Sequence, residues 1–136
     1  MIIAVDFDGT IVEHKYPKIG KEKPFAIDTL RRLASEGHKI ILWTSREGEL
    51  LEDAIRFCKQ RGLSFYSVNS DTPMRSLTFS NKTSSTKLVA DVYIDDRNLG
   101  GLPDWGEIYE IVNGAKRHYH SSRHHRRSFL RRLFHR

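Results

Sequence analysis

Acidic residues stand at the ends of two apolar segments, and this placement constrains the fold more than any other feature of the sequence. Ile2–Phe7 is a short run rich in β-branched residues, typical of a buried strand, and it leads into Asp8, Gly9 and Thr10. A second run, Asp91–Ile94, ends in a pair of aspartates. If both runs are strands of one parallel sheet, their carboxyl ends meet at the same edge, where such folds place their ligands.

The rest of the chain supports a parallel sheet, because strand-like and helix-like segments alternate. Each predicted helix has apolar residues at helical spacing and a glycine just beyond it, namely Gly37, Gly62 and Gly114. The pattern predicts an α/β fold: a single three-layer Rossmann-like domain. The predicted strands are Ile2–Phe7, Lys39–Trp43, Ser64–Val68 and Asp91–Ile94, and the predicted helices are Phe25–Ser35, Glu49–Gln60 and Asp104–Val112.

The net charge of +6 is unevenly distributed along the 136 residues. Residues 115–136 hold eight of the 23 Lys and Arg residues and no acid, so residues 1–114 carry 15 basic against 17 acidic residues, or −2. We therefore expect a core domain at 1–114 and a basic, His/Arg-rich tail at 115–136. The tail is either a disordered, solubilising extension or an amphipathic helix that binds nucleic acid, an anionic membrane or an acidic protein.

Two further features bear on location and redox chemistry. The sequence starts directly with a strand-like segment, without a basic stretch followed by a long apolar run, so a cytoplasmic location is expected. The single cysteine, Cys58, lies among helix-forming residues and is interpreted as an apolar core residue rather than a nucleophile.

The acids themselves suggest a metal site. Asp6, Asp8, Asp95 and Asp96 would repel one another at a shared sheet edge unless a cation lies among them. A hard divalent cation with oxygen ligands fits such a site, and Mg²⁺ suits one that also holds phosphate. The alternative is that these are solvated loop acids, which are common singly but less expected at two strand ends of one sheet.

Four motifs in order, namely Asp6-Phe7-Asp8-Gly9-Thr10, ILWT, a lysine and YIDD, resemble those of the haloacid dehalogenase (HAD-like) superfamily of phosphohydrolases. The longer segments ILWTSREGELL and YIDDRNLGGLPDWGEIY are similar to those of short bacterial members. The resemblance covers about residues 1–113. It implies a magnesium-dependent phosphatase, a phosphomonoester hydrolase that acts through an aspartyl-phosphate intermediate on a phosphorylated small molecule.

The resemblance also implies roles for individual residues. Asp6 would be the nucleophile, and Asp8 would act as general acid and then as general base. Phosphate would be bound by Thr44, Ser45 and a lysine, for which Lys87 is preferred over Lys82; helix capping is the alternative for Thr44. The magnesium ligands would be the Asp6 carboxylate, the Asp8 backbone carbonyl and the Asp95-Asp96 pair, with Asp96 the direct contact.

Substrate selection is less defined. The predicted connections are too short for a large cap domain, so a bulky substrate, a neighbouring subunit of a homo-oligomer or the 11–24 loop would close the site. His14, Arg46 and Arg97 are candidates for contacting the substrate. Two other interpretations remain: a phosphoacceptor similar to response-regulator receivers, which the motif order disfavours, and a catalytically weak HAD-like module that binds a phosphorylated or polyanionic partner.

Overall fold

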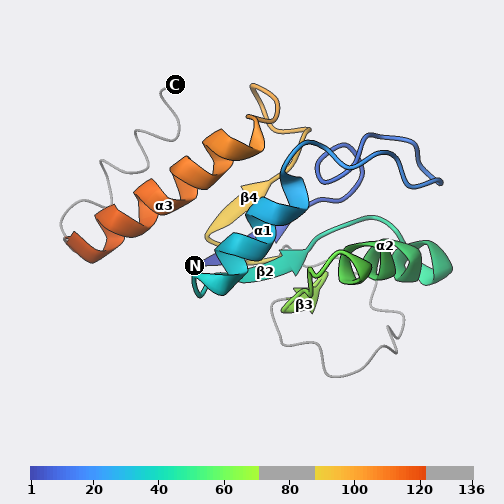
Figure 1. Ribbon diagram of the computed structural model, residues 1–136, viewed down its shortest axis with the longest axis horizontal. Coiled ribbons are helices and arrows are strands. Elements are labelled where there is room, and N and C mark those ends of the chain that lie inside the picture. Colours follow the sequence, from blue (N-terminus) through green and yellow to red (C-terminus); the bar gives the residue numbers. More distant parts are fainter. Residues whose placement is uncertain (71–87, 122–136) are drawn as a thin grey trace. The chain divides into compact units, whose positions relative to one another are not determined.

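The computed structural model describes residues 1–70 and 88–121, with side chains described as far as residue 114. The chain divides into two compact units, Met1–Leu102 and Pro103–Arg136. Figure 1 shows that, among the described residues, the first unit contains all the strands together with helices α1 and α2, and the second contains helix α3. Lys82, Lys87 and most of the basic tail lie outside the described residues.

The first unit is an α/β fold built on a parallel sheet, as predicted. Strand β1 pairs in parallel with β2 on one side and with β4 on the other, and β3 pairs in parallel with β2, which gives the order β3-β2-β1-β4. Val5, at the end of β1, lies in register with Leu42 and Ile94. The elements are β1 (Ile2–Val5), α1 (Ala26–Ser35), β2 (Lys39–Leu42), α2 (Gly48–Gln60), β3 (Ser67–Val68) and β4 (Val92–Ile94).

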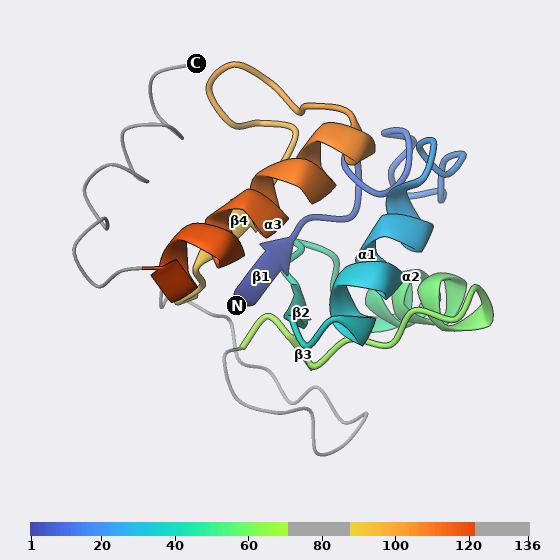
Figure 2. The ribbon, with the colours of Figure 1, turned by 60° about the vertical axis from the view of Figure 1, so that its left-hand side comes forward.

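Both faces of the sheet carry apolar side chains. Successive residues of a strand point to opposite faces, and β1 and β2 are apolar at successive positions. On one face, Phe7 packs edge-on against Phe57 of α2, with ring centroids 5.9 Å apart. Helices α1 and α2 join strands that step across the sheet in the same direction, so right-handed crossovers put both on this face. Figure 2 shows both helices to the same side of β1 and β2. The other face has a core of Ala4, Ile41 and Leu88.

The two helices of the first unit bury the faces that their apolar spacing predicted. Helix α1 buries Ala26, Ile27, Leu30 and Leu33, and α2 buries Leu51, Ala54 and Cys58. Burial in apolar surroundings raises the pKa of the Cys58 thiol to about 12, which fits an apolar core residue and not a nucleophile.

The connection between β1 and α1 is a small hairpin, which we call the 11–23 hairpin. Its arms are joined by two backbone hydrogen bonds, from Glu13 N–H to the Lys21 carbonyl and from Lys23 N–H to the Ile11 carbonyl, both 2.8 Å long. No folded cap domain stands in this connection. The connection between β3 and β4 includes residues 71–87, which lie outside the described part of the chain.

The second unit begins with helix α3 (Trp105–Ser121). Asp104 precedes it and accepts a 2.9 Å hydrogen bond from Glu107 N–H, as a helix N-cap does. The predicted stop at Gly114 is wrong, since the helix continues to Ser121. A mid-helix glycine costs only about 1 kcal/mol, and good helix formers follow it. Within the described residues, no helix is long and apolar enough to cross a membrane.

Candidate functional site

Three carboxylates converge at the carboxyl edge of the sheet. Asp6 directly follows β1 and its N–H donates to the Ile94 carbonyl of the neighbouring strand, while Asp95 and Asp96 directly follow β4. One carboxylate oxygen from each of the three lies within 4.8 Å of the others. The predicted meeting of distant acids is therefore confirmed for these three residues, which are all half-buried.

Asp96 is fixed by two residues of the turn after β1. The buried Thr10 hydroxyl accepts a 3.0 Å hydrogen bond from Asp96 N–H and donates to Asp96 Oδ1 at 3.3 Å. Gly9 adopts a φ of +83°, and a Cβ atom there would lie 2.3 Å from Asp96 Oδ2. Glycine is thus required both by the backbone and by the close approach of the acid. Sequence reasoning gave Thr10 no role, although its place in the first motif was a signal.

Asp95 organises the turn that follows β4. Its Oδ1 accepts a 2.9 Å hydrogen bond from Arg97 N–H, and its carbonyl accepts one from Asn98 N–H. Arg97 is exposed beside this turn.

The acidic cluster is electrostatically costly. Burial, followed by repulsion from Asp95, Asp96 and Asp8, raises the pKa of Asp6 from 3.8 to about 7, and a hydrogen bond from Phe7 N–H only partly opposes this. A divalent cation among the three carboxylates would relieve both the burial of charge and the repulsion. Their hard oxygen donors suit a cation of the Mg²⁺ or Ca²⁺ type, so the site can hold a metal ion.

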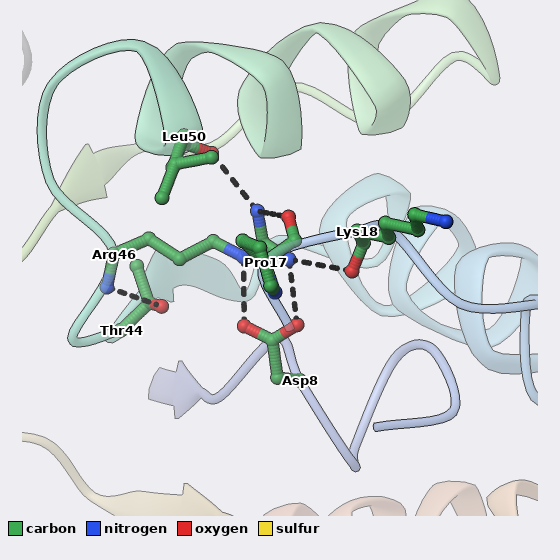
Figure 3. A network of polar contacts seen from close by, with 6 residues as sticks. All are labelled: Asp8, Pro17, Lys18, Thr44, Arg46 and Leu50. Carbon is green, nitrogen blue, oxygen red and sulfur yellow. Dashed lines mark hydrogen bonds and ion pairs between the residues drawn. The ribbon is translucent and has the colours of Figure 1, made fainter. Parts of the chain in front are cut away.

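Asp8 is not part of this group of three, because its carboxylate faces Arg46 (Figure 3). Arg46 donates from Nε to Asp8 Oδ2 at 2.7 Å and from Nη2 to Asp8 Oδ1 at 2.8 Å. The Arg46 residue is only 1% exposed. The hydrogen bond with Asp8 raises the pKa of Arg46 above its usual value. The sequence made Arg46 a candidate for contacting the substrate. In the structure its guanidinium group binds the Asp8 carboxylate.

Thr44 and Ser45 occupy the turn between β2 and α2. Thr44 N–H donates to Asn69 Oδ1 at 2.8 Å, and the Thr44 hydroxyl accepts from Arg46 N–H at 3.1 Å. The residue at the N-cap of α2 is Glu47, so the Thr44 hydroxyl tightens the turn instead of capping the helix. Accepting that bond uses a lone pair and leaves the hydroxyl able to donate. Asn69, with a φ of 52°, is a supporting residue that local sequence pattern did not indicate.

The remaining candidate residues are spread more widely. Ser45 is exposed in the turn after β2, and His14 is exposed in the 11–23 hairpin. Lys87, the predicted phosphate-binding lysine, lies outside the described residues, as does its alternative Lys82.

Comparison with solved structures identifies a relative of this chain. No family model and no curated protein matches the chain. A solved structure of a conserved protein from Bacteroides thetaiotaomicron is 57% identical, with a TM-score of 0.74, over 85% of this chain and 91% of that one. At this identity and coverage the two share their fold and more than half of the aligned residues. The chain therefore belongs to the same family as this conserved Bacteroides protein.

Proposed function

We propose that this protein is a magnesium-dependent phosphohydrolase of the HAD-like type, with Asp6 as its nucleophile. The observation that carries the proposal is the half-buried acidic cluster of Asp6, Asp95 and Asp96 at the carboxyl edge of a parallel sheet. The motif that surrounds Asp6 resembles the nucleophile motif of that superfamily, and the raised pKa of Asp6 fits a group at a functional site.

The acidic cluster supplies the ligands that magnesium requires. Asp6, Asp96 and Asp95 would hold the ion, together with the backbone carbonyl of Asp8. When bound, magnesium neutralises charge on the phosphoryl oxygens and lowers the pKa of Asp6. Thr10 and Gly9 would keep Asp96 in place for this role. At metal sites, residues that contact the metal ligands commonly orient them in this way.

The reaction would proceed in two displacements at phosphorus. An Asp6 carboxylate oxygen forms a bond to phosphorus as the bond to the leaving oxygen breaks, and the leaving oxygen takes up a proton from Asp8. A water oxygen then bonds to phosphorus as the Asp6–phosphorus bond breaks; Asp8 accepts the water proton, and inorganic phosphate leaves. Thr44, Ser45 and Lys87 would bind the phosphate oxygens during both steps.

A second candidate is a catalytically weak HAD-like module that binds a phosphorylated or polyanionic partner. It is favoured by one observation, that both carboxylate oxygens of Asp8 accept hydrogen bonds from Arg46. Each oxygen keeps a second lone pair, so this pairing does not by itself prevent catalysis.

Turnover of an aryl phosphate separates the two candidates. We expect phosphate release from p-nitrophenyl phosphate with Mg²⁺, its loss with EDTA, and a fall of at least about 10³-fold in Asp6→Asn. Asp28→Asn is a matched control, because this aspartate is 80% exposed on α1. Near-normal turnover in Asp6→Asn would refute the assigned nucleophile. Saturable phosphate binding without turnover would favour the binding module, and a panel of sugar and nucleotide phosphates would then define the ligand.

A further inference from the structure

Arg46 is a buried cation whose hydrogen-bonding capacity is fully used inside the protein (Figure 3). A guanidinium group has five N–H donors. Two of them bind the two oxygens of Asp8. The other three bind backbone carbonyls: Nη1 donates to Pro17 at 3.3 Å and to Leu50 at 3.2 Å, and Nη2 donates to Lys18 at 3.1 Å.

These five acceptors belong to three different parts of the first unit. Asp8 follows β1 beside the acidic cluster, Pro17 and Lys18 form the tip of the 11–23 hairpin, and Leu50 lies in the first turn of α2. The Arg46 side chain therefore connects the turn that carries Asp8 to the tip of the 11–23 hairpin and to α2. Lysine could not replace it, because three donors on a single nitrogen cannot make a bidentate bond and reach three carbonyls as well.

Two aromatic rings complete the surroundings of the guanidinium. Its Cζ atom lies 5.2 Å from the Phe7 ring centroid and 5.2 Å from the Tyr16 ring centroid. Phe7 is fully buried, whereas Tyr16 is 50% exposed. Tyr16 is therefore partly open to solvent while its ring contacts the cation that binds Asp8, so the hairpin tip is connected to Asp8 through Arg46.

We infer that Arg46 is a positioning residue, which holds the Asp8 carboxylate and the tip of the 11–23 hairpin in one fixed arrangement beside the acidic cluster. It acts through Asp8 and not on the substrate, because its donors are already used and its side chain is buried. The hairpin tip is then held in a fixed position relative to the turn that carries Asp8. The effect on turnover rests on the proposed function, whereas the effect on the hairpin does not.

Steady-state kinetics test the first part. We expect Arg46→Lys and Arg46→Met to lower kcat about 100-fold while KM changes less than about 3-fold, because a misplaced acid–base group slows chemistry more than binding. The matched control is Arg56→Met, since Arg56 likewise pairs with an aspartate, Asp53, but is exposed and lies on α2. A raised KM with unchanged kcat would mean that Arg46 binds the substrate, and would overturn the inference.

A double-mutant cycle asks whether Arg46 acts through Asp8. In an Asp8→Asn background, Arg46→Met should lower the remaining kcat by less than about 3-fold, since the group that it positions is already lost. If the two substitutions instead multiply, Arg46 has an independent role and the inference fails.

Hydrogen exchange provides a readout that needs no activity. In Arg46→Met, amides of the 11–23 hairpin should exchange at least about 10-fold faster, while those of α1 and the Arg56→Met protein stay unchanged. Equal acceleration in α1 would indicate general destabilisation, and no acceleration would disprove the coupling; either result overturns the inference. If Arg46→Met does not fold, Arg46→Lys, which keeps the charge, takes its place. A wild-type protein without phosphatase activity would refute the proposed function. Hydrogen exchange would still test whether Arg46 fixes the 11–23 hairpin.

Discussion

Binding of Mg²⁺ should depend on pH through the ionisation of Asp6. The perturbation is a change from about pH 5.5 to about pH 8 in metal-free protein. With a pKa of about 7, Asp6 is ionised in about 3% of molecules at the lower pH and in about 90% at the higher. A carboxylate must lose its proton to bind a metal ion. The Kd for Mg²⁺ should therefore be about 30-fold higher at the lower pH, which means weaker binding.

The same shift predicts how the metal-free protein responds to pH. The folded state holds the Asp6 proton more tightly than the unfolded chain, whose pKa is the ordinary 3.8. The free energy of unfolding should therefore fall as pH rises between about 4 and about 7. The fall should be about 2 kcal/mol, once solvent screening of a half-buried group is taken into account. Magnesium should reverse most of this loss at neutral pH.

Isothermal titration calorimetry with Mg²⁺ measures the first effect, and urea unfolding in EDTA measures the second. Asp6→Asn is the control for both, because asparagine does not titrate: its Mg²⁺ affinity should be low and should depend little on pH. A wild-type Kd that is equal at the two pH values would refute the reasoning. So would a pH dependence of the same size in Asp6→Asn, since the titrating group would then be a different one.

Three further substitutions, two of them with a matched control variant, separate the acidic site from the core. Thr10→Ala should weaken Mg²⁺ binding about 10-fold, because Asp96 loses its partner, and Thr10→Ser should restore it. Gly9→Ala should destabilise the protein by about 3 kcal/mol in urea unfolding. Gly48→Ala, also at positive φ but with open space around it, should cost only about 1 kcal/mol; equal costs would contradict the close approach to Asp96. Leu30→Ala should cost about 3 kcal/mol while the Kd for Mg²⁺ stays unchanged, as measured by calorimetry.

Chain segments with a clear local pattern were predictable. The apolar run before Asp6 and the run before Asp95 each indicated a strand, and helical spacing of apolar residues indicated α1 and α2. Once the strands are parallel, their carboxyl ends must share an edge, so the meeting of Asp6 with Asp95 and Asp96 follows from the order of elements. The end of α3 was missed because a single glycine is only a weak stop signal.

The sequence by itself therefore determined the α/β class and the acidic edge, because both depend on periodicity and chain order, which are local properties. The tertiary structure alone decided which side chains face one another. Asp8 lies two residues from Asp6, yet its carboxylate faces Arg46, 38 residues away, and that arginine also binds the hairpin. Such pairings depend on the directions of side chains and on the packing of loops against helices. Neither the spacing nor the composition of the chain encodes them in a form that can be read before folding.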